Sequence, residues 1–400
     1  MSSSSTADAL PLASLTVIAI EQYGAGPFGT QHLADLGAEI IKIENKADGG
    51  DVGRHVGPHY FGDNDSHFYQ SFNRNKKSMT VDLKTAQGQD ILRRLASKAD
   101  AVFNNLRGDL PKKLGADYAS LAPVNRQIVC AHLSAYGRSG SRSAWPGYDY
   151  LMQSEAGYLS LTGEPEGPPA RMGLSMIDLM TGTTAAMGLL AGVTGARATG
   201  IGRDIDVSLF DVALHNLAYV ATWYLNAGVV LGREPRSTHP SLTPSQLYPT
   251  KDGWIFIMCN KEKFWGVLCN KIERPDWAQK PEYRSFSDRL ANRGELNREL
   301  EAVLVTRTTG EWMERFSGSV PAAPVFDVRQ ALDNDFVREQ HRVIELQHPS
   351  GPVRSVASPV RAGNHPLRPA PAMGQHNHEL LKQAGFSERE IHEFEQAGVI

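Results

Sequence analysis

The sequence predicts an α/β fold in which a doubly wound parallel sheet carries helices on both faces. Three observations support this prediction. Short β-branched or apolar runs alternate with amphipathic helices through the first half of the 400-residue chain. Polar clusters follow several of the strands, at the edge of a parallel sheet where ligands bind. From about Val229, prolines and serines interrupt the alternation, which indicates a second, smaller α+β domain.

The predicted elements of the first half alternate along the chain. Strands are expected at residues 16–20, 40–43, 78–83, 101–103, 128–133 and 204–209. Helices are expected at residues 86–98, 180–196 and 212–226. The helix at 180–196 is apolar and rich in small residues, which let another backbone approach closely. We therefore expect it at the centre of the domain or in an interface.

The second half predicts fewer strands. One is expected at 254–259, with helices at 264–271 and 295–306 and crossovers at 233–248 and 320–325. Prolines in the second crossover forbid a central strand there. The last helix should begin at a capping box that runs from Ser387 to Glu390.

The composition indicates a globular protein, since 41% of the residues are hydrophobic and 21% are charged. The 41 Lys and Arg nearly balance the 44 Asp and Glu, so no broad basic field favours nucleic acid or an anionic membrane. Three widely spaced cysteines favour a reducing compartment. No apolar run of about 18 residues and no secretory signal are evident. We expect a cytoplasmic protein whose first eleven residues, MSSSSTADALP, form a disordered tail.

The segment 17–44, VIAIEQYGAGPFGTQHLADLGAEIIKIE, contains a GxGxxG pattern between Gly24 and Gly29 and ends at Glu44. A dinucleotide site uses such glycines to approach a pyrophosphate, and a carboxylate to bind the ribose. Two details disfavour that site. The first glycine comes four residues after the strand, and Pro27 lacks an N–H for phosphate. Pro27 is better suited to the first position of a helix.

Asp178 is the strongest single candidate for chemistry. It stands between a loop rich in glycine and proline, residues 163–173, and the long apolar helix. The macrodipole and unpaired N–H groups at a helix N-terminus would keep its carboxylate ionised, and those groups could also stabilise an oxyanion. The alternative is an N-cap aspartate, worth about 1 kcal/mol. The pattern alone leaves both interpretations open.

Several blocks together resemble the family III CoA-transferases. Besides 17–44 they are GDVGR at 50–54, NRNKKSMTVDLK at 73–84, ADAVFNNL at 99–106, GIGRDIDVS at 200–208, and short blocks at 374–376, 385–387 and Ile391. They occur in order over nearly the whole chain after residue 12, so the resemblance is specific. The family includes formyl-CoA:oxalate and carnitine CoA-transferases, and α-methylacyl-CoA racemase is related to it.

The resemblance implies a site for a CoA ester and no dinucleotide. By position it assigns contacts with CoA to Gly24, Ala25, Val81, Asp82, Leu83, Lys84, Asn105, Leu106, Arg107, Ser134, Ala135, Tyr136 and Gly137. The cations expected near the CoA phosphates are Lys84, Arg107 and Lys113. Each lysine has a plain alternative as a solvated surface charge.

The chain departs from the family pattern at three places. Formyl-CoA transferase has an arginine after the glutamate that matches Glu44, where this chain has Asn45. A lysine two residues before the tyrosine matching Tyr136 is Ser134 here. The glycine-run substrate loop is replaced by THPSLT at 238–243. We therefore expect CoA contacts that differ in detail and a different acid substrate.

Racemase activity and a metal site are both disfavoured. The racemases need a proton-abstracting histidine where this chain has Tyr148, and a tyrosine with a pKa of about 10 is a poor base at neutral pH. Of the 13 histidines, only His376 and His378 have metal-ligand spacing, and a loop or cap explains them better. No metal or redox cofactor is expected.

The resemblance implies a large CoA-binding domain at 12–227, a small domain at 228–325, and a linker with a C-terminal return to the large domain at 326–400. Members of the family are interlocked homodimers, and we expect the same assembly here. The implied reaction transfers CoA from an acyl-CoA, for which we choose succinyl-CoA, to a free carboxylic acid. Asp178 would attack the donor thioester and then carry CoA as an aspartyl thioester.

A small dicarboxylate is the expected acceptor. Arg171 precedes Asp178 by seven residues, and its planar fork suits a second carboxylate. His239 stands in the loop that replaces the glycines. A surface arginine and a hinge are the alternatives. The runner-up function is intramolecular CoA transfer on a dicarboxylate; a Rossmann oxidoreductase and a non-catalytic CoA-binding protein represent other classes.

Overall fold

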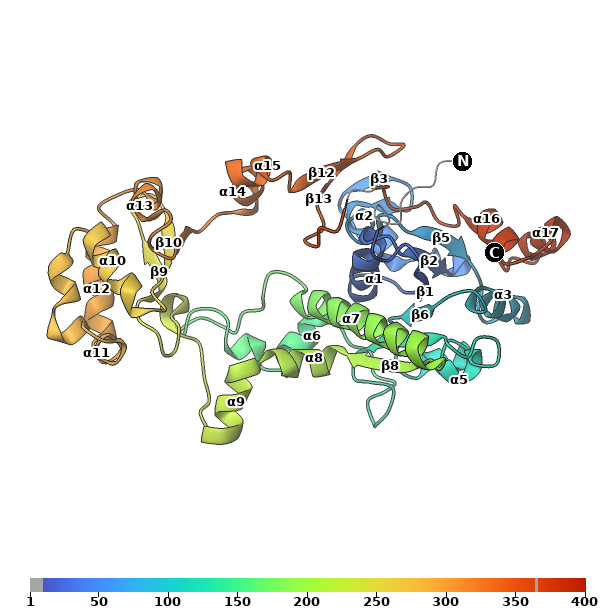
Figure 1. The fold of residues 1–400 in the computed structure, drawn as a ribbon, viewed down its shortest axis with the longest axis horizontal. Coiled ribbons are helices and arrows are strands. Elements are labelled where there is room, and N and C mark those ends of the chain that lie inside the picture. Colours follow the sequence, from blue (N-terminus) through green and yellow to red (C-terminus); the bar gives the residue numbers. More distant parts are fainter. Residues whose placement is uncertain (1–9, 364–365) are drawn as a thin grey trace. The chain divides into compact units, whose positions relative to one another are not determined.

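The computed structural model describes residues 10–363 and 366–400, which form two compact units (Figure 1). The first comprises residues up to Ala156, then Gly173–Ala218 and His341–Ile400; the second comprises Gly157–Met172 and Tyr219–Gln340. The range 228–325, predicted as the small domain, lies within the second unit. Residues 1–9 of the predicted N-terminal tail lie outside the described part of the chain.

The first unit contains a six-stranded parallel sheet with the order β5-β2-β1-β6-β7-β8. Winding proceeds outward from β1 in one direction and from β6 in the other, so the predicted doubly wound sheet is confirmed. The switch point between β1 and β6 is where such sheets bind ligands. The strands are β1 Thr16–Ile20, β2 Glu39–Glu44, β5 Lys77–Thr80, β6 Ala101–Asn104, β7 Val129–Ser134 and β8 Arg203–Ser208.

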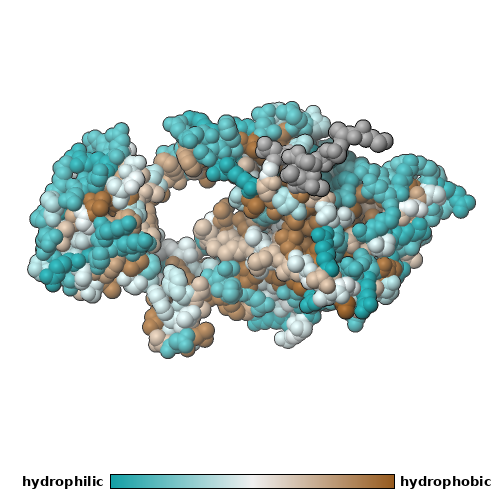
Figure 2. All heavy atoms as spheres, viewed as in Figure 1, coloured by the Kyte–Doolittle hydropathy of each residue, from teal (hydrophilic) through white to brown (hydrophobic). Residues whose placement is uncertain are grey.

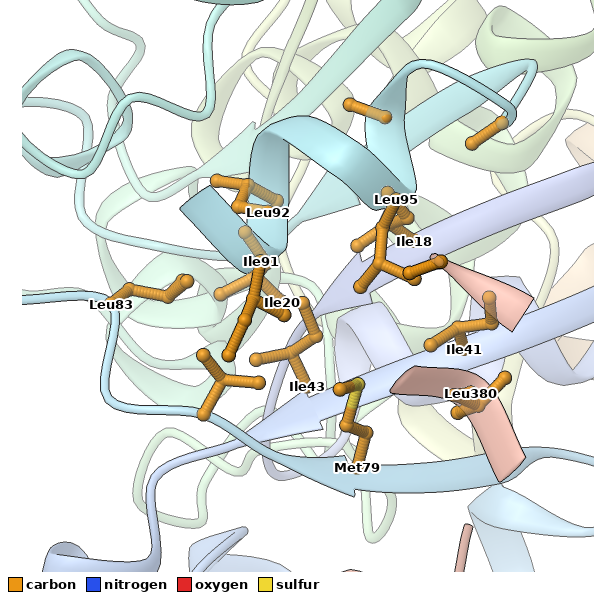
Figure 3. Close-up of a cluster of buried hydrophobic side chains, with 14 of the residues drawn as sticks. Ile18, Ile20, Ile41, Ile43, Met79, Leu83, Ile91, Leu92, Leu95 and Leu380 are labelled. Carbon is orange, nitrogen blue, oxygen red and sulfur yellow. The ribbon is translucent and has the colours of Figure 1, made fainter. Parts of the chain in front are cut away.

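One face of the sheet packs against α3 (Ala86–Ala96) and the C-terminal helices α16 (Asn377–Gln383) and α17 (Glu388–Gln396). In Figure 3, Ile91 of α3 and Leu380 of α16 lie over the strand side chains. Full burial of each such side chain stabilises the fold by about 1.5–3 kcal/mol. The chain therefore returns to its first unit because the apolar stripes of the last two helices complete this core.

The other face carries α1 (Ala25–Asp35) and α7 (Met176–Thr199), whose backbones touch where the helices cross. A Cβ added to Gly29 would lie 2.4 Å from the carbonyl oxygen of Gly182, and one added to Gly182 would lie 2.3 Å from that of Ala25. Only glycine permits so close an approach. The small residues of α7 therefore serve helix packing, as its predicted central position requires.

The apolar character of α7 has two readings. By length and composition the helix could cross a membrane, with a mean hydropathy of 1.4, but the core helix of a soluble protein passes the same test. This hydropathy refers to an 18-residue window of the helix, and half of that window is buried, against α1 and the sheet.

The remaining α-helices and strands of the first unit are α2 His67–Asn73, α4 Leu110–Lys113, α5 Tyr118–Leu121, α6 Asp149–Glu155, α8 Leu209–Asn216, β3 Tyr60–Gly62, β4 Asp65–Ser66, β12 Val343–Leu346 and β13 Val353–Val356.

The single helix predicted at 212–226 is wrong, because two helices, α8 and α9 (Ala218–Ala227), replace it. The chain breaks at Ala218, whose φ is +46°. Apolar side chains are exposed on α9, among them Tyr224 and Leu225. Figure 2 shows brown patches among paler residues on this helix.

The second unit has an antiparallel sheet with the order β11-β10-β9. β11 (Ala322–Pro324) lies at the edge of the sheet, as Pro321 before it and Pro324 within it predict. β9 (Ser245–Pro249), missed within the predicted crossover, pairs along the whole of β10 (Trp254–Met258), and its Ser245, Gln246 and Tyr248 are buried. The helices are α10 Glu262–Lys271, α11 Phe286–Ala291, α12 Arg293–Leu304, α13 Thr309–Phe316, α14 Val328–Asp333 and α15 Asp335–Glu339.

Candidate active site

Asp178 lies in the first turn of α7, and its side chain faces the N-terminus of α1. The residue is 6% exposed. Gly24 is the N-cap of α1, and a Cβ added there would lie 3.2 Å from Asp178 Oδ2. The glycine crossing of α1 and α7 thus brings the first turns of two helices together around one carboxylate.

Asp178 is not the N-cap of α7, so the capping alternative is wrong. The N-cap is Ser175, whose side chain makes no capping hydrogen bond. The backbone N–H of Asp178 instead donates to Asp149 Oδ2 at 2.9 Å. Asp149 is the first residue of α6 and is 3% exposed. A second buried carboxylate therefore stands next to Asp178.

The electrostatics of Asp178 differ from the prediction. Burial, and then repulsion from Asp149, raise the pKa of Asp178 to about 7. We expected unpaired N–H groups to keep the carboxylate ionised, but its own N–H is occupied by Asp149. Among the described residues, no basic side chain pairs with it. At neutral pH the group therefore exists both as a carboxylate and as an acid.

A cavity of about 200 Å³ opens beside Asp178 at the carboxyl edge of the sheet. Eight of the predicted site residues line it: Gly24, Ala25, Asn105, Leu106, Arg107, Ser134, Ala135 and Asp178. The sequence did not single out other lining residues, which are Gln22, Tyr23, Leu133, Trp145, Pro146, Gly147 and Leu209. Tyr148, considered above only as a base, also lines it.

A second cavity of about 190 Å³ adjoins the first, since Gln22 and Leu106 line both. Its lining includes the remaining predicted loop, Val81, Asp82, Leu83 and Lys84. The switch point between β1 and β6 therefore carries two adjoining chambers, which we treat as one candidate site.

The second cavity lies over a cluster of buried charges, which includes Glu44. Burial alone would raise the pKa of Glu44, but Arg54 lowers it to about 2 through two hydrogen bonds of 2.7 Å. Lys42 and Asp51 form a further buried pair at 2.8 Å. Because Arg54 holds Glu44, this carboxylate is not placed to bind a ribose.

The GxGxxG glycines have packing roles. A Cβ on Gly26 would lie 2.9 Å from the side chain of Asn105, just as Gly29 meets α7. Pro27 is the third helical residue and not the predicted first, because α1 begins at Ala25. These packing contacts explain the glycines of the GxGxxG pattern, and Arg54 already occupies the Glu44 carboxylate. The pattern therefore needs no dinucleotide to explain it.

Of the cations predicted to bind the CoA phosphates, some line the cavities and one does not. Arg107 and Lys113 share one partner, Asp109, at 2.6 and 2.7 Å. Lys113 is largely exposed and does not line either cavity. Lys84 is exposed at the second cavity. Two of the three cations therefore lie at the site, one in each chamber.

Other predicted residues lie elsewhere. Tyr136 donates its hydroxyl to Glu155 at 2.7 Å, and Gly137 donates its N–H to Ser134 Oγ at 3.0 Å. Arg171 and His239 belong to the second unit. Arg171 donates to the carbonyl of Met172, and burial lowers the pKa of His239.

Sequence reasoning missed Tyr23 and Asp149. Tyr23 has a φ of +67°, and its N–H donates to Asp51 Oδ1 at 2.8 Å, which fixes the turn into α1. A positive φ at a tyrosine leaves no signal in the sequence. Asp149 follows Tyr148 in the loop considered for a base, so its neighbour could have drawn attention to it.

The comparisons with known proteins bear on this site. Residues 12–377 match CoA-transferase family III. The chain belongs to this family. A succinate–glutarate CoA-transferase from Agrobacterium fabrum is 31% identical, over 95% of this chain and 97% of its own. A succinyl-CoA:glutarate CoA-transferase from Homo sapiens is 32% identical, over 98% of this chain and 90% of its own.

Solved structures give the same fold. The crystal structure of a CAIB/BAIF family protein from Brucella suis is 29% identical and superposes with a TM-score of 0.80, over 94% of this chain and 99% of that chain. The protein is therefore an enzyme of the CoA-transferase class. Within residues 10–363 and 366–400, no group of three or more His, Cys, Asp or Glu side chains is arranged to hold a metal ion.

Proposed function

We propose that this CoA-transferase moves CoA from an acyl-CoA to a free dicarboxylic acid, with Asp178 as the covalent carrier. The observation that carries the proposal is the Asp178 carboxylate, buried without a cationic partner at a cavity that adjoins a second chamber. A carboxylate destabilised in this way is a stronger nucleophile than a solvated one. The thioester would lie in the chamber of Asp178, and the rest of CoA would extend past Leu106.

The proposed reaction has two symmetric halves. An Asp178 oxygen attacks the thioester carbonyl, CoA leaves as a thiolate, and a mixed anhydride forms. The thiolate then attacks the aspartyl carbonyl, which releases the donor acid and leaves an aspartyl-CoA thioester. The acceptor carboxylate attacks that thioester, and the returning thiolate attacks the new anhydride at the acceptor's carbonyl. Asp178 is thereby regenerated as a carboxylate.

The test is mass spectrometry of enzyme incubated with succinyl-CoA, after proteolysis and trapping with hydroxylamine. We expect a hydroxamate on the peptide that contains Asp178, because hydroxylamine displaces CoA from an aspartyl thioester, and no transfer by Asp178→Ala. Asp178→Asn is the matched control, since the amide preserves shape but cannot form the anhydride. Transfer by either variant within tenfold of wild type would contradict the covalent mechanism.

A dicarboxylate acceptor is supported by the relatives named for glutarate. We also propose Arg171 as the ligand of its second carboxylate, on its place in the chain seven residues before Asp178. Arg171→Ala should cost about 1.5–3 kcal/mol in kcat/KM with glutarate, the usual worth of a charged hydrogen bond. A monocarboxylate of equal length is the control. Equal losses for both acceptors would remove Arg171 from the proposal.

Two alternatives within the fold have direct tests. A 2-methylacyl-CoA in D₂O should exchange its α-hydrogen no faster with enzyme than without, because Tyr148 is a weak base. Rapid exchange would favour a racemase. If CoA moves only between the two carboxyl groups of one dicarboxylate, and labelled free acid is not incorporated into the acyl-CoA, the intramolecular reaction would be favoured.

We propose a cytoplasmic homodimer. The apolar side chains exposed on α9 support a partner surface, and the three buried, unpaired cysteines support a reducing compartment. Analytical ultracentrifugation should give twice the chain mass, and a monomer at micromolar concentration would contradict the assembly. Fractionation of cells should recover the protein with soluble cytoplasmic markers; recovery with the membrane or periplasmic fraction would contradict this location.

A further inference from the structure

The first turn of α7 obtains its cap from another helix. Ser175, the N-cap, makes no side-chain hydrogen bond to the turn, and the N–H of Asp178 donates to Asp149 Oδ2 at 2.9 Å. An N-cap side chain usually belongs to the residue that begins the helix, whereas here the capping carboxylate belongs to α6. The bond therefore ties the nucleophile's own backbone to α6.

Asp149 is itself held firmly. Its other oxygen, Oδ1, accepts from the side-chain amide of Gln153, one turn along α6, and the same amide donates to the carbonyl of Leu174 at 3.2 Å. Asp149 is 3% exposed, and no ion pair among the described residues includes it. Asp149 is therefore shielded from solvent and has no cationic partner among the described residues, and its carboxylate acts on Asp178 at close range.

The groups that face Asp178 come from every element packed against its turn. Just before α6 this is Tyr148, which lines the same cavity, and on α6 it is Asp149; before α1 these are Tyr23 and the N-cap Gly24, and α1 itself offers Ala25. Arg107 lies across the cavity, paired with Asp109, while Asp211 of α8 is bonded to Ser208. Asp149 is the only one of these that acts on Asp178 as a buried fixed charge.

We propose that Asp149 is a positioning residue that caps the turn of the nucleophile and, through its charge, favours the aspartyl-CoA intermediate over the free enzyme. This inference rests on the function proposed above. In the first half-reaction the negative charge of Asp178 leaves with the donor acid, and the aspartyl thioester is neutral. Repulsion by Asp149 thus acts on the free Asp178 carboxylate and ends when the thioester forms. The charge of Asp149 shifts the internal equilibrium toward the intermediate.

Two substitutions separate the cap from the charge. Asp149→Asn keeps a carbonyl oxygen for the Asp178 N–H and removes the charge, whereas Asp149→Ala removes both. In Asp149→Asn, the acidic limb of kcat/KM should move down by about one pH unit. At a fixed ratio of succinyl-CoA to succinate, the ratio of aspartyl-CoA to free enzyme should fall about tenfold, the equivalent of that shift. Asp149→Ala should show the same two changes and also a lower kcat, because it removes the acceptor of the Asp178 N–H as well as the charge.

Asp211→Asn is the matched control, since it removes an acid from the first turn of α8 and should move neither readout. An unchanged acidic limb together with an unchanged intermediate ratio in Asp149→Asn would overturn the inference. The stability of the ligand-free protein provides a readout without turnover. Between about pH 4 and 8, the destabilisation that Asp178 causes should shrink in Asp149→Asn. If wild type forms no adduct on Asp178, the proposed function fails, while this stability readout still decides the role of Asp149.

Discussion

Two buried carboxylates of the first unit, Glu44 and Asp178, have opposite electrostatic surroundings. Glu44 is clamped by Arg54 and accepts a further hydrogen bond from Ser78, and its pKa is lowered to about 2. Asp178 has no cationic partner and a second carboxylate beside it, and its pKa is raised to about 7. Each of them lines one of the two adjoining cavities. Burial by itself therefore does not set the character of an acid here.

The difference teaches which carboxylate holds the fold and which is available for chemistry. A carboxylate with a full set of donors is stable as an anion and a poor nucleophile, since attack would require it to give up those bonds. A carboxylate that is destabilised in the resting protein gains when it forms a covalent bond. Four predictions test this contrast, from the largest effect to the smallest.

Removing the partner of Glu44 should destabilise the protein most. Arg54→Ala leaves a buried carboxylate without its cation, which costs about 3–5 kcal/mol of unfolding free energy. Urea denaturation measures this change. The double variant Glu44→Gln with Arg54→Met is the control, because replacement of both charges should recover most of the loss. A cost of Arg54→Ala below about 1 kcal/mol would show that Glu44 is not held by this pair.

Removing the charge of Asp178 should raise the unfolding free energy, the opposite of the change expected for Arg54→Ala. Its folded pKa is raised from 3.8 to about 7. Below about pH 4 both the folded and the unfolded chain hold the proton, so the group contributes nothing; as pH rises further, the unfolded chain ionises first and the fold loses stability. Asp178→Asn should therefore be more stable than wild type by about 2–4 kcal/mol at about pH 8 and equal near pH 4.

Glu44→Gln is the natural control for this pH dependence. The pKa of Glu44 is depressed in the fold, so its contribution is present above the unfolded pKa and is lost as pH falls toward about 2. The variant should be destabilised at neutral pH and approach wild type at low pH. The contrast between the two carboxylates would break if both amides shifted stability in the same direction.

A methyl group at Gly24 should disturb Asp178 without disturbing the fold. The added Cβ would lie 3.2 Å from Asp178 Oδ2, so the carboxylate must move by a few tenths of an ångström. We expect Gly24→Ala to lower kcat about tenfold, because small misplacements of a reacting group are costly. Gly195→Ala, on the same α7 but with nothing within 4 Å, is the control and should leave kcat unchanged. Equal kcat values for the two variants would separate Gly24 from the nucleophile.

The smallest effect is expected at Asp109, the partner of Arg107 and Lys113. Asp109→Asn should free both cations and lower the KM for acyl-CoA about twofold to fivefold at low ionic strength, with little effect in high salt. Asp90→Asn, which breaks an exposed pair with Arg94 on α3, is the control. A KM that rises, or that changes equally in the control, would remove these cations from CoA binding.

The sheet was predictable because its signals are local. The strands at Thr16–Ile20 and Ala101–Asn104 are short apolar runs that end in polar residues, and the capping box at Ser387 marks its helix by side chains three residues apart. Boundaries were less accurate where tertiary contacts decide them. The break at Ala218 and the strand Ser245–Pro249 depend on what packs against each segment, and no residue type in them signals it.

The candidate site was predictable as a set of loops and less so as a set of charges. Eight predicted residues line the cavity of Asp178, because the carboxyl ends of parallel strands must meet at one edge. The prediction that Asp178 stays ionised was wrong, since it counted the helix N-terminus and not Asp149, which lies 29 residues earlier in the chain. Such a partner is visible only after folding.

The sequence alone determined the alternation of strands and helices in the first half, the family and the identity of the carboxylate at the start of the apolar helix, since each rests on residue types and short spacings. The tertiary structure decided which buried acid is neutralised and which is not. That outcome depends on distances between side chains far apart in the chain, Arg54 on Glu44 and Asp149 on Asp178. Electrostatic energy in a dry interior changes steeply with such distances, so the same residue type becomes a structural anion in one place and a candidate nucleophile in the other.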